Sequence, residues 1–302
     1  MTSVPWRSRH AVTLLTAGPV ALAAITGVVL LARPDAPPTT VARPVPFADQ
    51  QLSPAQQESL DHAEDVLTRR CMRGRGMDFT VTARADQQPA TSTNPYGLLD
   101  PAEVAKHGYG LRDAGQGPQD PPLADRENDA LFGTGAHEKA IALPEGGQLV
   151  VRTDGCFYQA QTQLYGEDWK VLLYNEQTLY GRVIARVQGD SGVVAAQGRW
   201  ADCMRRAGYQ VTTLAEARPD AQGRMDATGA DRAAGQAEFT RLRTQAKRDL
   251  VCQRKSKVLP AIQRAQTDAE RVVAGGQQDR LRELAALRAG ALATARQLAD
   301  AG

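Results

Sequence analysis

The feature of this sequence that most restricts its fold is a segment that occurs twice. Residues 71–80 (CMRGRGMDFT) align without a gap on residues 203–212 (CMRRAGYQVT), with the shared pattern C-M-R-x-x-G-x-x-x-T. Each copy ends a run with helical periodicity, and glycine is the residue that most readily takes the left-handed conformation in which helices often end. A second cysteine, Cys156 or Cys252, follows each copy on another helical run. The repeat therefore predicts two helix pairs, each closed by one disulfide.

The four cysteines allow three disulfide connectivities. If the two copies of the repeat are equivalent, each should bond the next cysteine along the chain, which gives Cys71–Cys156 and Cys203–Cys252. In the chain-entropy model each bond stabilises the fold by roughly 4 kcal/mol. The alternative is four buried free thiols. A redox-active pair is not expected because the chain has no C-x-x-C, and the cysteine spacing does not fit a zinc site.

A long apolar segment lies near the N-terminus. Residues 11–32 contain no charged side chain and are numerous enough to cross a bilayer, and Arg7 and Arg9 precede them. This pattern predicts either an uncleaved membrane anchor, which the length favours, or a cleaved signal peptide. Both interpretations place the rest of the chain in an extracytoplasmic location, anchored to the cell membrane or secreted. Four cysteines fit an oxidising compartment of that kind.

The chain then divides into three segments. Residues 1–33 form the anchor or signal peptide, residues 34–52 form a proline-rich linker that should be an extended spacer, and residues 53–302 form the extracytoplasmic domain with its internal duplication. A long irregular insertion occupies 83–136 within the domain. It is interrupted by two short helices, and we expect it to be a solvated lid.

The composition of the domain favours helices packed on helices. Aromatic residues make up only 5% of the chain and hydrophobic residues 42%, so alanine, leucine and valine must supply most of the core. We expect a mainly α, disulfide-stapled helical bundle with a small β-hairpin at 140–152 and the long insertion. An apolar stripe that keeps its phase from 259 to 299 predicts one long helix with a weak point at Gly275–Gly276. Trp200, one turn before Cys203, should lie in the core.

The sequence contains no recognisable catalytic signature. It has neither the G-x-S-x-G of a nucleophile elbow nor a phosphate-binding glycine loop. His137-Glu138 lacks the second histidine of a helical metalloprotease motif. We therefore expect no catalytic residue, no metal site and no cofactor. The formal net charge is only +2, and three of the positive charges flank the apolar segment, so the neutral body argues against a nucleic-acid partner.

One stretch of the chain is strongly basic. Between Arg241 and Arg264 there are eight basic residues and one acid, Asp249. On a tethered extracytoplasmic domain, such a stretch predicts binding to anionic lipid headgroups or to an anionic cell-wall polymer. The residues that we assign to this surface are Lys247, Arg248, Arg254, Lys255, Lys257 and Arg264. The competing interpretations are a solvated helix face, or charge pairing with the acidic part of the insertion at 100–138.

Several short motifs are spread over the domain. They are Arg70-Cys71-Met72 with Gly76, the H-G-Y-G of 107–110, the A-L-F-G of 130–133, Gly155-Cys156, Leu164-Tyr165-Gly166 and the W-A-D-C-M-R of 200–205 with Gly208-Tyr209. Together with the Ala/Arg-rich C-terminal helix, these motifs resemble a family of exported, cysteine-containing helical proteins of actinobacteria. The resemblance covers nearly all of the chain from residue 53 onward. It implies an exported location and this style of fold, and it assigns no catalytic residue.

Three functions remain open from the sequence. The first, which we favour, is a non-enzymatic cell-envelope protein that binds a wall or lipid surface. The second is a cell-envelope hydrolase that uses acids of the insertion or Glu167 and Asp168. The third is a dimeric helical scaffold that self-associates through 259–299. Acids converging in a deep pocket would favour the second function, and an exposed apolar stripe on the last helix would favour the third.

Overall fold

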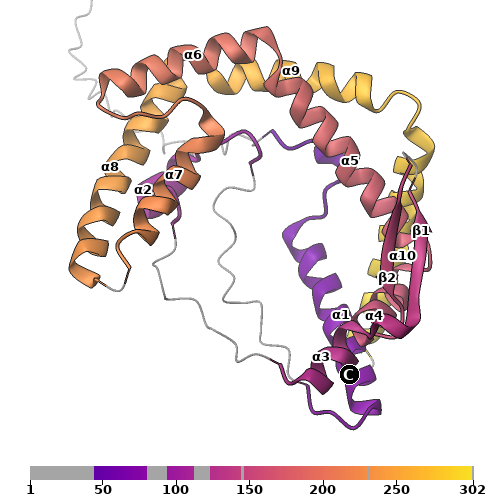
Figure 1. Cartoon of the computed structure of the whole chain (residues 1–302). Coiled ribbons are helices and arrows are strands. Elements are labelled where there is room, and N and C mark those ends of the chain that lie inside the picture. Colours follow the sequence, from indigo (N-terminus) through magenta and orange to yellow (C-terminus); the bar gives the residue numbers. More distant parts are fainter. Residues whose placement is uncertain (1–43, 80–93, 112–122, 144–145, 230, 301–302) are drawn as a thin grey trace, which may run out of the picture. The chain divides into compact units, whose positions relative to one another are not determined.

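The computed structural model describes residues 44–79, 94–111, 123–143, 146–229 and 231–300 (Figure 1). In these ranges the chain is mainly helical, with ten α-helices, one small antiparallel sheet and two disulfides. The expected fold class is therefore confirmed. The apolar segment at 11–32 lies outside the described residues, and no helix within them is long and apolar enough to cross a membrane.

The elements follow one another in a simple order along the chain. The first half contains α1 (Pro54–Gly74), α2 (Pro101–His107), α3 (Asp125–Phe132), α4 (Cys156–Tyr165) and α5 (Trp169–Gln188). The second half contains α6 (Ser191–Arg206), α7 (Leu214–Asp226), α8 (Arg232–Lys255), α9 (Val258–Val273) and α10 (Gln278–Asp300). Two short 3-10 turns, η1 (Ala48–Gln50) and η3 (Gly135–His137), and two strands, β1 (Glu138–Ala142) and β2 (Gln148–Arg152), complete the set. The strands form the predicted hairpin, with Ala140 opposite Val150.

Local sequence signals fix where the first helices begin. At the start of α1, the Ser53 hydroxyl accepts the N–H of Gln56 (3.3 Å) and the Gln56 side chain accepts the N–H of Ser53 (2.8 Å). This reciprocal capping box satisfies two donors that a helix start otherwise leaves unpaired. Asp100 caps α2 by accepting two backbone N–H groups.

The two copies of the repeat fold alike at the ends of α1 and α6. In each copy the glycine of the pattern is left-handed, with φ of +74° at Gly76 and +89° at Gly208. In each copy the N–H after this glycine donates to the methionine carbonyl: Met77 to Met72 (3.1 Å) and Tyr209 to Met204 (3.0 Å). This is the Schellman arrangement, which needs a residue without a Cβ at the left-handed position. The repeat is therefore a helix-ending turn used twice.

The predicted disulfide pairing is confirmed. Cys71–Cys156 joins the end of α1 to the start of α4, and Cys203–Cys252 joins the end of α6 to α8, with Cα separations of 5.6 and 5.7 Å. The second cysteines differ in position, because Cys156 begins its helix whereas Cys252 lies one turn before the end of α8. The duplication therefore holds for the C-M-R-x-x-G turn and not for the helix to which the turn is bonded.

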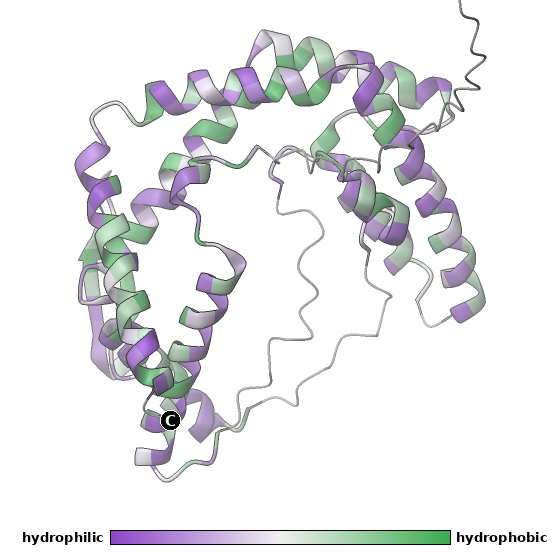
Figure 2. Cartoon of the chain, turned by 180° about the vertical axis from the view of Figure 1, so that it is seen from behind, coloured by the Kyte–Doolittle hydropathy of each residue, from purple (hydrophilic) through white to green (hydrophobic). Residues whose placement is uncertain are grey.

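The helices enclose separate hydrophobic cores. One small core lies between α1, α4 and α10, and a larger one lies among α5, α6, α7, α8 and α9. Trp200 is fully buried in the larger core, as predicted. Figure 2 shows hydrophobic and hydrophilic residues alternating along most helices, which is the pattern of helices with one buried side. α5 packs on both α9 and α10. A third, small core lies where α1, α3 and α4 meet, around Met72 and Leu131.

The described parts of the insertion at 83–136 are not a solvated lid. Five of its side chains are buried in the larger core: Tyr96, Leu98, Val104, Tyr109 and Leu111. The backbone at Gly97, with φ of +73°, passes so close to Leu214 that a Cβ would lie 2.3 Å from its carbonyl oxygen. The lid prediction is therefore wrong for these residues, because their apolar side chains and one close backbone contact fasten the insertion to the domain. Residues 80–93 and 112–122 lie outside the described residues.

Two helices, and not one, carry the C-terminal apolar stripe. α9 ends at Val273 and α10 begins at Gln278, with Gly276 left-handed between them (φ +77°). The prediction of one helix over 259–299 is wrong because Gly276 takes a conformation that a right-handed helix does not contain. The apolar side of α10 is buried in the chain itself, with Leu284 only 1% exposed.

The second half of the proline-rich linker is attached to the domain. Phe47 is almost fully buried, and its ring stacks on that of Tyr180 with the centroids 5.7 Å apart. Its N–H donates to Glu270 Oε1 on α9 (2.9 Å). The extended-spacer prediction is therefore wrong for residues 44–52. Their prolines indicated a spacer because they remove helical periodicity, but the Phe47 ring and hydrogen bonds from Gln266 and Arg288 to backbone carbonyls of the segment hold it in place.

Candidate functional site

One side of α8 carries four of the six predicted basic residues. Lys247, Arg248, Arg254 and Lys255 have the spacing i, i+1, i+7, i+8, which places them on one side of an α-helix. All four side chains are exposed. Val251 lies among them and is 38% exposed, although it is apolar. The predicted residues on α8 are therefore brought together by the helix.

The other two predicted residues follow the end of α8. Lys257 separates α8 from α9, is exposed and has a left-handed backbone (φ 56°). Arg264 lies about two turns into α9, where its Nε donates to the carbonyl of Pro260 (3.3 Å). We use the name basic face for Lys247, Arg248, Arg254, Lys255 and Lys257. Arg264 belongs to another helix and is not included.

The basic face has no anionic partner within the described ranges of the chain. None of its five side chains forms an ion pair there. The cation that does pair on α8 is Arg241, which lies before the basic face and contacts Glu238 (2.8 Å). Asp100 of the acidic insertion caps α2. Within these ranges the five charges are therefore not neutralised by an ion pair.

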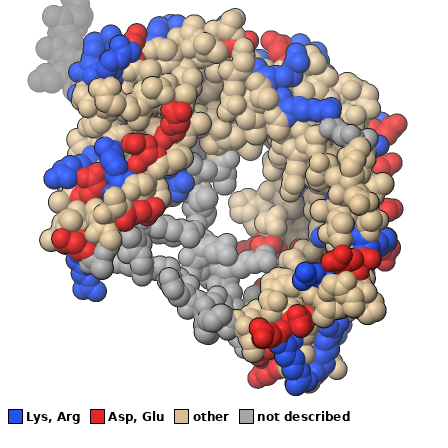
Figure 3. All heavy atoms as spheres, in the orientation of Figure 1, with Lys and Arg blue, Asp and Glu red and all other residues tan. Residues whose placement is uncertain are grey.

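The Cys203–Cys252 disulfide brings a further cation to this region. Arg199 on α6 donates to the carbonyl of Ser256 at the end of α8 (3.2 Å). Figure 3 shows Lys and Arg side chains gathered at the left-hand end of α6, near the disulfide-bonded α8. Sequence analysis missed Arg199 because it lies 57 residues from Ser256 along the chain. The sequence nevertheless contained a signal for this contact. Arg199 is one turn before Cys203, and Ser256 is one turn after Cys252. If the two disulfide-bonded helices run antiparallel, these two residues lie next to each other.

The single acid of the basic stretch points into the core. Asp249 is fully buried and accepts hydrogen bonds from three side chains: Trp200 Nε1 (2.7 Å), Gln253 Nε2 (2.9 Å) and the Tyr109 hydroxyl (2.9 Å). Burial raises the pKa of Asp249 to about 6, and the three donors oppose this rise. Asp249 therefore does not neutralise the basic face. It joins α6 and α8 to the H-G-Y-G segment of the insertion.

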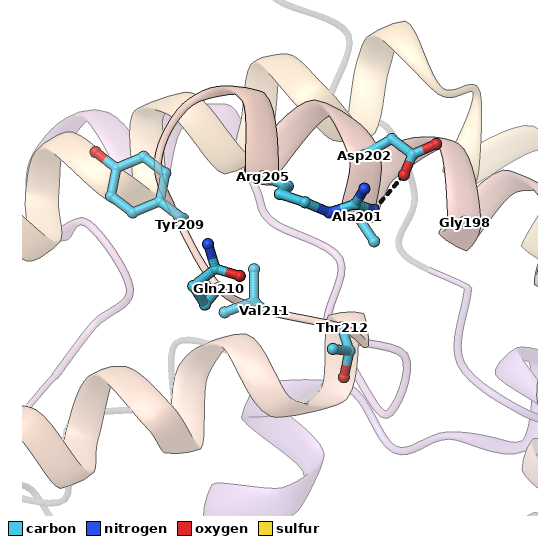
Figure 4. A pocket seen from close by; sticks show the side chains of 8 residues that line it. All are labelled: Gly198, Ala201, Asp202, Arg205, Tyr209, Gln210, Val211 and Thr212. Atoms are coloured by element: carbon cyan, nitrogen blue, oxygen red, sulfur yellow. Dashed lines mark hydrogen bonds and ion pairs between the residues drawn. The ribbon is translucent and has the colours of Figure 1, made fainter.

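An open groove of about 410 Å³ lies beside α6 (Figure 4). Its walls are four positions of α6 and the segment that follows the repeated turn: Gly198, Ala201, Asp202, Arg205 and residues 209–212. Asp202 and Arg205 form an ion pair within α6. Figure 4 shows their side chains above the space and those of Gln210 and Val211 below it. Sequence analysis did not single out this groove, because it depends on how the chain turns back along α6.

A second groove, of about 590 Å³, lies between the hairpin and α4, and one acid proposed for a hydrolase lines it. Glu167 is exposed there and forms an ion pair with Lys139 (3.7 Å). Asp168 is also exposed. Glu167 is the one carboxylate among the residues that line this groove, so no second acid faces it there. Among the residues that the structure describes, no group of three or more His, Cys, Asp or Glu side chains is arranged to hold a metal ion.

The two disulfides fit a protein of an oxidising compartment. The disulfides do not indicate which molecule the protein binds. A scan against models of known families, a search of curated proteins and a search of solved structures each found no match. The function therefore has to be argued from the geometry of this chain.

Proposed function

We propose that this protein is a non-enzymatic extracytoplasmic module that binds an anionic surface through the basic face of α8. The observation that carries the proposal is that five exposed cations on one side and end of a helix have no ionic partner in the described structure. Each Lys or Arg near an anionic membrane surface contributes about 1 kcal/mol of attraction. Five such residues support an attachment that needs no deep pocket and that weakens as salt is added.

The way in which α8 is held supports this function. The Cys203–Cys252 disulfide fixes α8 to α6, and Arg243 on α8 donates to the carbonyl of Ala105 on α2 (3.2 Å). The buried carboxylate of Asp249 adds a third attachment. A helix held at three points presents its charges in a fixed array. Binding then costs less conformational entropy than it would from a mobile basic tail.

Two features support an extracytoplasmic location. The disulfides need an oxidising compartment to form and persist, and the apolar segment at 11–32 has the length of a membrane anchor. The ligand chemistry is a dense array of phosphate or carboxylate groups. A lipid headgroup layer and an anionic cell-wall polymer both offer it, and the experiment below separates these two sources.

The test uses the chain from residue 42 onward, which contains the whole packed unit, with its disulfides formed. Sedimentation would be measured with anionic vesicles, with zwitterionic vesicles and with an insoluble anionic wall polymer, at low and high salt. The double variant Lys255→Glu with Lys257→Glu should weaken binding by at least roughly 30-fold, since losing two attractions of about 1 kcal/mol each already has that effect. Binding to vesicles alone would identify lipid as the source, and binding to the polymer alone would identify the wall.

The matched control is Arg186→Glu with Arg296→Glu. These arginines are exposed on α5 and α10, so the control makes the same change in net charge away from α8. It should leave most of the binding intact. The proposal is wrong if the control weakens binding as much as the α8 variant does. It is also wrong if the unaltered protein binds neither surface at low salt.

The scaffold alternative has less support than surface binding. It relied on an apolar stripe exposed to a second copy, but the buried residues of α10 face the chain's own helices: Leu281, Leu284, Ala291 and Ala295. The hydrolase alternative lacks a pair of carboxylates in the groove that contains Glu167. We therefore argue only the surface-binding function.

A further inference from the structure

We propose that the groove beside α6 is a binding site for a neutral saccharide unit. This site is separate from the basic face and does not depend on the proposed function. Its volume of about 410 Å³ is within the usual range of small-ligand sites, and it is open along one side, which suits one or two sugar rings of a longer chain.

The charge of the groove excludes an anionic ligand. Arg205 is the one cation among its lining residues, and Asp202 in the same wall neutralises it through their ion pair. Phosphate and carboxylate ligands need uncompensated donors or cations, so they gain little here. The lining mixes both kinds of surface, because five of its eight residues carry polar groups and Gly198, Ala201 and Val211 do not, so a fully apolar ligand would leave polar groups unpaired. A neutral ligand rich in hydroxyl groups fits both conditions.

The polar groups of the groove have hydrogen-bonding capacity to spare. Neither the Tyr209 hydroxyl nor the Gln210 amide has a side-chain partner in the described part of the chain. The Thr212 hydroxyl donates to Glu216 Oε2 (2.6 Å), which leaves its own lone pairs as acceptors. Amide, hydroxyl and paired carboxylate–guanidinium groups together offer both donors and acceptors, as a sugar's hydroxyl groups require.

Tyr209 supplies the apolar element that a sugar ring needs. It is half-buried, packs against the larger core and also lines the groove. Aromatic rings present a flat apolar face together with a polar edge, and the C–H face of a sugar ring stacks on such a surface. In Figure 4 the Tyr209 ring stands at one end of the groove and the Gln210 amide lies next to it. A sugar stacked on the ring would therefore have its hydroxyl groups near the amide.

Comparison of the two copies of the repeat indicates that the fold does not require the residues of this groove. The helix-ending turn is the same in both copies, but the aligned side chains differ. Counted from the cysteine of each copy, the positions of Gly198 and Ala201 on the preceding helix and of Tyr209 in the turn hold larger or non-aromatic residues in the first copy: Val66, Arg69 and Met77. A Cβ on Gly198 would meet nothing within 4 Å, so the fold does not require glycine there. Small wall residues and an aromatic ring are therefore properties of the second copy that the turn itself does not demand.

The first copy also provides the test variants. Gly198→Val and Tyr209→Met each introduce the residue found at the same distance from the cysteine in the first copy, Val66 on its helix and Met77 in its turn. Gly198→Val should fill the groove, and Tyr209→Met should remove the stacking ring. Gly181→Val on α5 is the matched control, because it is another exposed helical glycine whose Cβ would meet nothing within 4 Å. Thermal unfolding of each variant reports whether the fold is kept.

The experiment uses the full chain with both disulfides formed. Saturation-transfer NMR would screen neutral oligosaccharides built from hexose, pentose and N-acetylhexosamine units, with inorganic phosphate as the anionic probe. We expect at least one neutral oligosaccharide to bind, Gly198→Val and Tyr209→Met each to weaken it at least tenfold, and Gly181→Val to leave it unchanged. The Lys255→Glu with Lys257→Glu variant should bind the saccharide normally, which separates this site from the basic face. The proposal is overturned if no neutral oligosaccharide binds, if phosphate competes for the site, or if both groove variants bind as the unaltered protein does.

Discussion

At the scale of single residues, the protonation of Asp249 depends strongly on the fold. Burial raises its pKa from 3.8 to about 6, so the folded protein holds this proton more tightly than the unfolded chain does. A raised carboxyl pKa adds stability that is present in full below about pH 4 and is lost as the pH rises through about 6. Hydrogen-bonded carboxylates such as Asp154 act in the opposite direction, because the bonds from Thr134 outweigh desolvation and lower its pKa.

The variant Asp249→Asn isolates this effect. It removes the titration but keeps a carbonyl oxygen for the indole N–H of Trp200. We expect the free energy of unfolding of the unaltered protein, relative to Asp249→Asn, to fall by on the order of 1–3 kcal/mol between pH 4 and pH 7. Urea unfolding followed by tryptophan fluorescence measures the difference. Asp268→Asn, at an exposed ion pair on α9, is the control and should show no such fall. A stability difference between the unaltered protein and Asp249→Asn that does not change with pH would contradict the raised pKa of Asp249.

The sequence placed Trp200 correctly but not Asp249, and the reason is physical. Trp200 shares a helix side with a disulfide cysteine, so its large apolar surface alone indicates burial. Asp249 is buried because three donors converge on it, and one of them, Tyr109, lies 140 residues away. Helical periodicity reports which side a residue occupies. It does not report which distant donors will meet there.

At the scale of elements, the buried ring of Phe47 is one contact through which the segment at 44–52 stabilises the fold. The variant Phe47→Ala removes the stacking on Tyr180 and leaves a gap beside α9. We expect it to lower the free energy of unfolding by about 2–4 kcal/mol, slightly less than a fully enclosed phenylalanine. Phe132→Ala is the control, because that side chain is 49% exposed and should cost much less. Equal losses in the two variants, measured by urea unfolding, would show that the segment is not anchored.

Most elements of this fold follow from local sequence signals, but their breaks and attachments do not. The hairpin and both disulfides were predicted from nearby residues or from the repeat. The break at Gly276 was missed because an apolar stripe keeps nearly the same phase whether the helix continues or restarts. The basic residues were predicted from the excess of basic over acidic residues between 241 and 264, although the structure places Arg264 on another helix. The groove at Tyr209 was not, because it is formed by two segments that meet only after the turn.

At the scale of the whole molecule, one ion pair ties several segments together. Arg288 on α10 binds both carboxylate oxygens of Glu176 on α5 (3.0 and 2.7 Å) and also donates to the carbonyl of Gln50 (2.8 Å). The side chains of Arg288 and Glu176 are only 16% and 7% exposed. Tyr180 donates a further hydrogen bond to Glu176 (2.8 Å). This pair therefore links α5, α10 and the segment before α1.

Removing one member of this pair should cost more than removing both. Arg288→Met leaves the Glu176 carboxylate buried without its cation, which we expect to cost about 3–5 kcal/mol. The double variant Arg288→Met with Glu176→Gln removes the buried charge as well and should be more stable than Arg288→Met alone. Denaturant unfolding of the three proteins measures the difference. A double variant that is the least stable of the three would show that the pair's attraction exceeds the cost of burying it.

The attachment of Phe47 to the domain also limits how far the protein reaches. If residues 11–32 anchor the chain, the fastened segment leaves only residues 33–43 between the bilayer and the packed domain, where the sequence pattern alone allowed 33–52. Eleven residues span at most about 40 Å, compared with about 70 Å for twenty. The domain would therefore stay within about 40 Å of the membrane surface. It could bind only those partners that reach this layer.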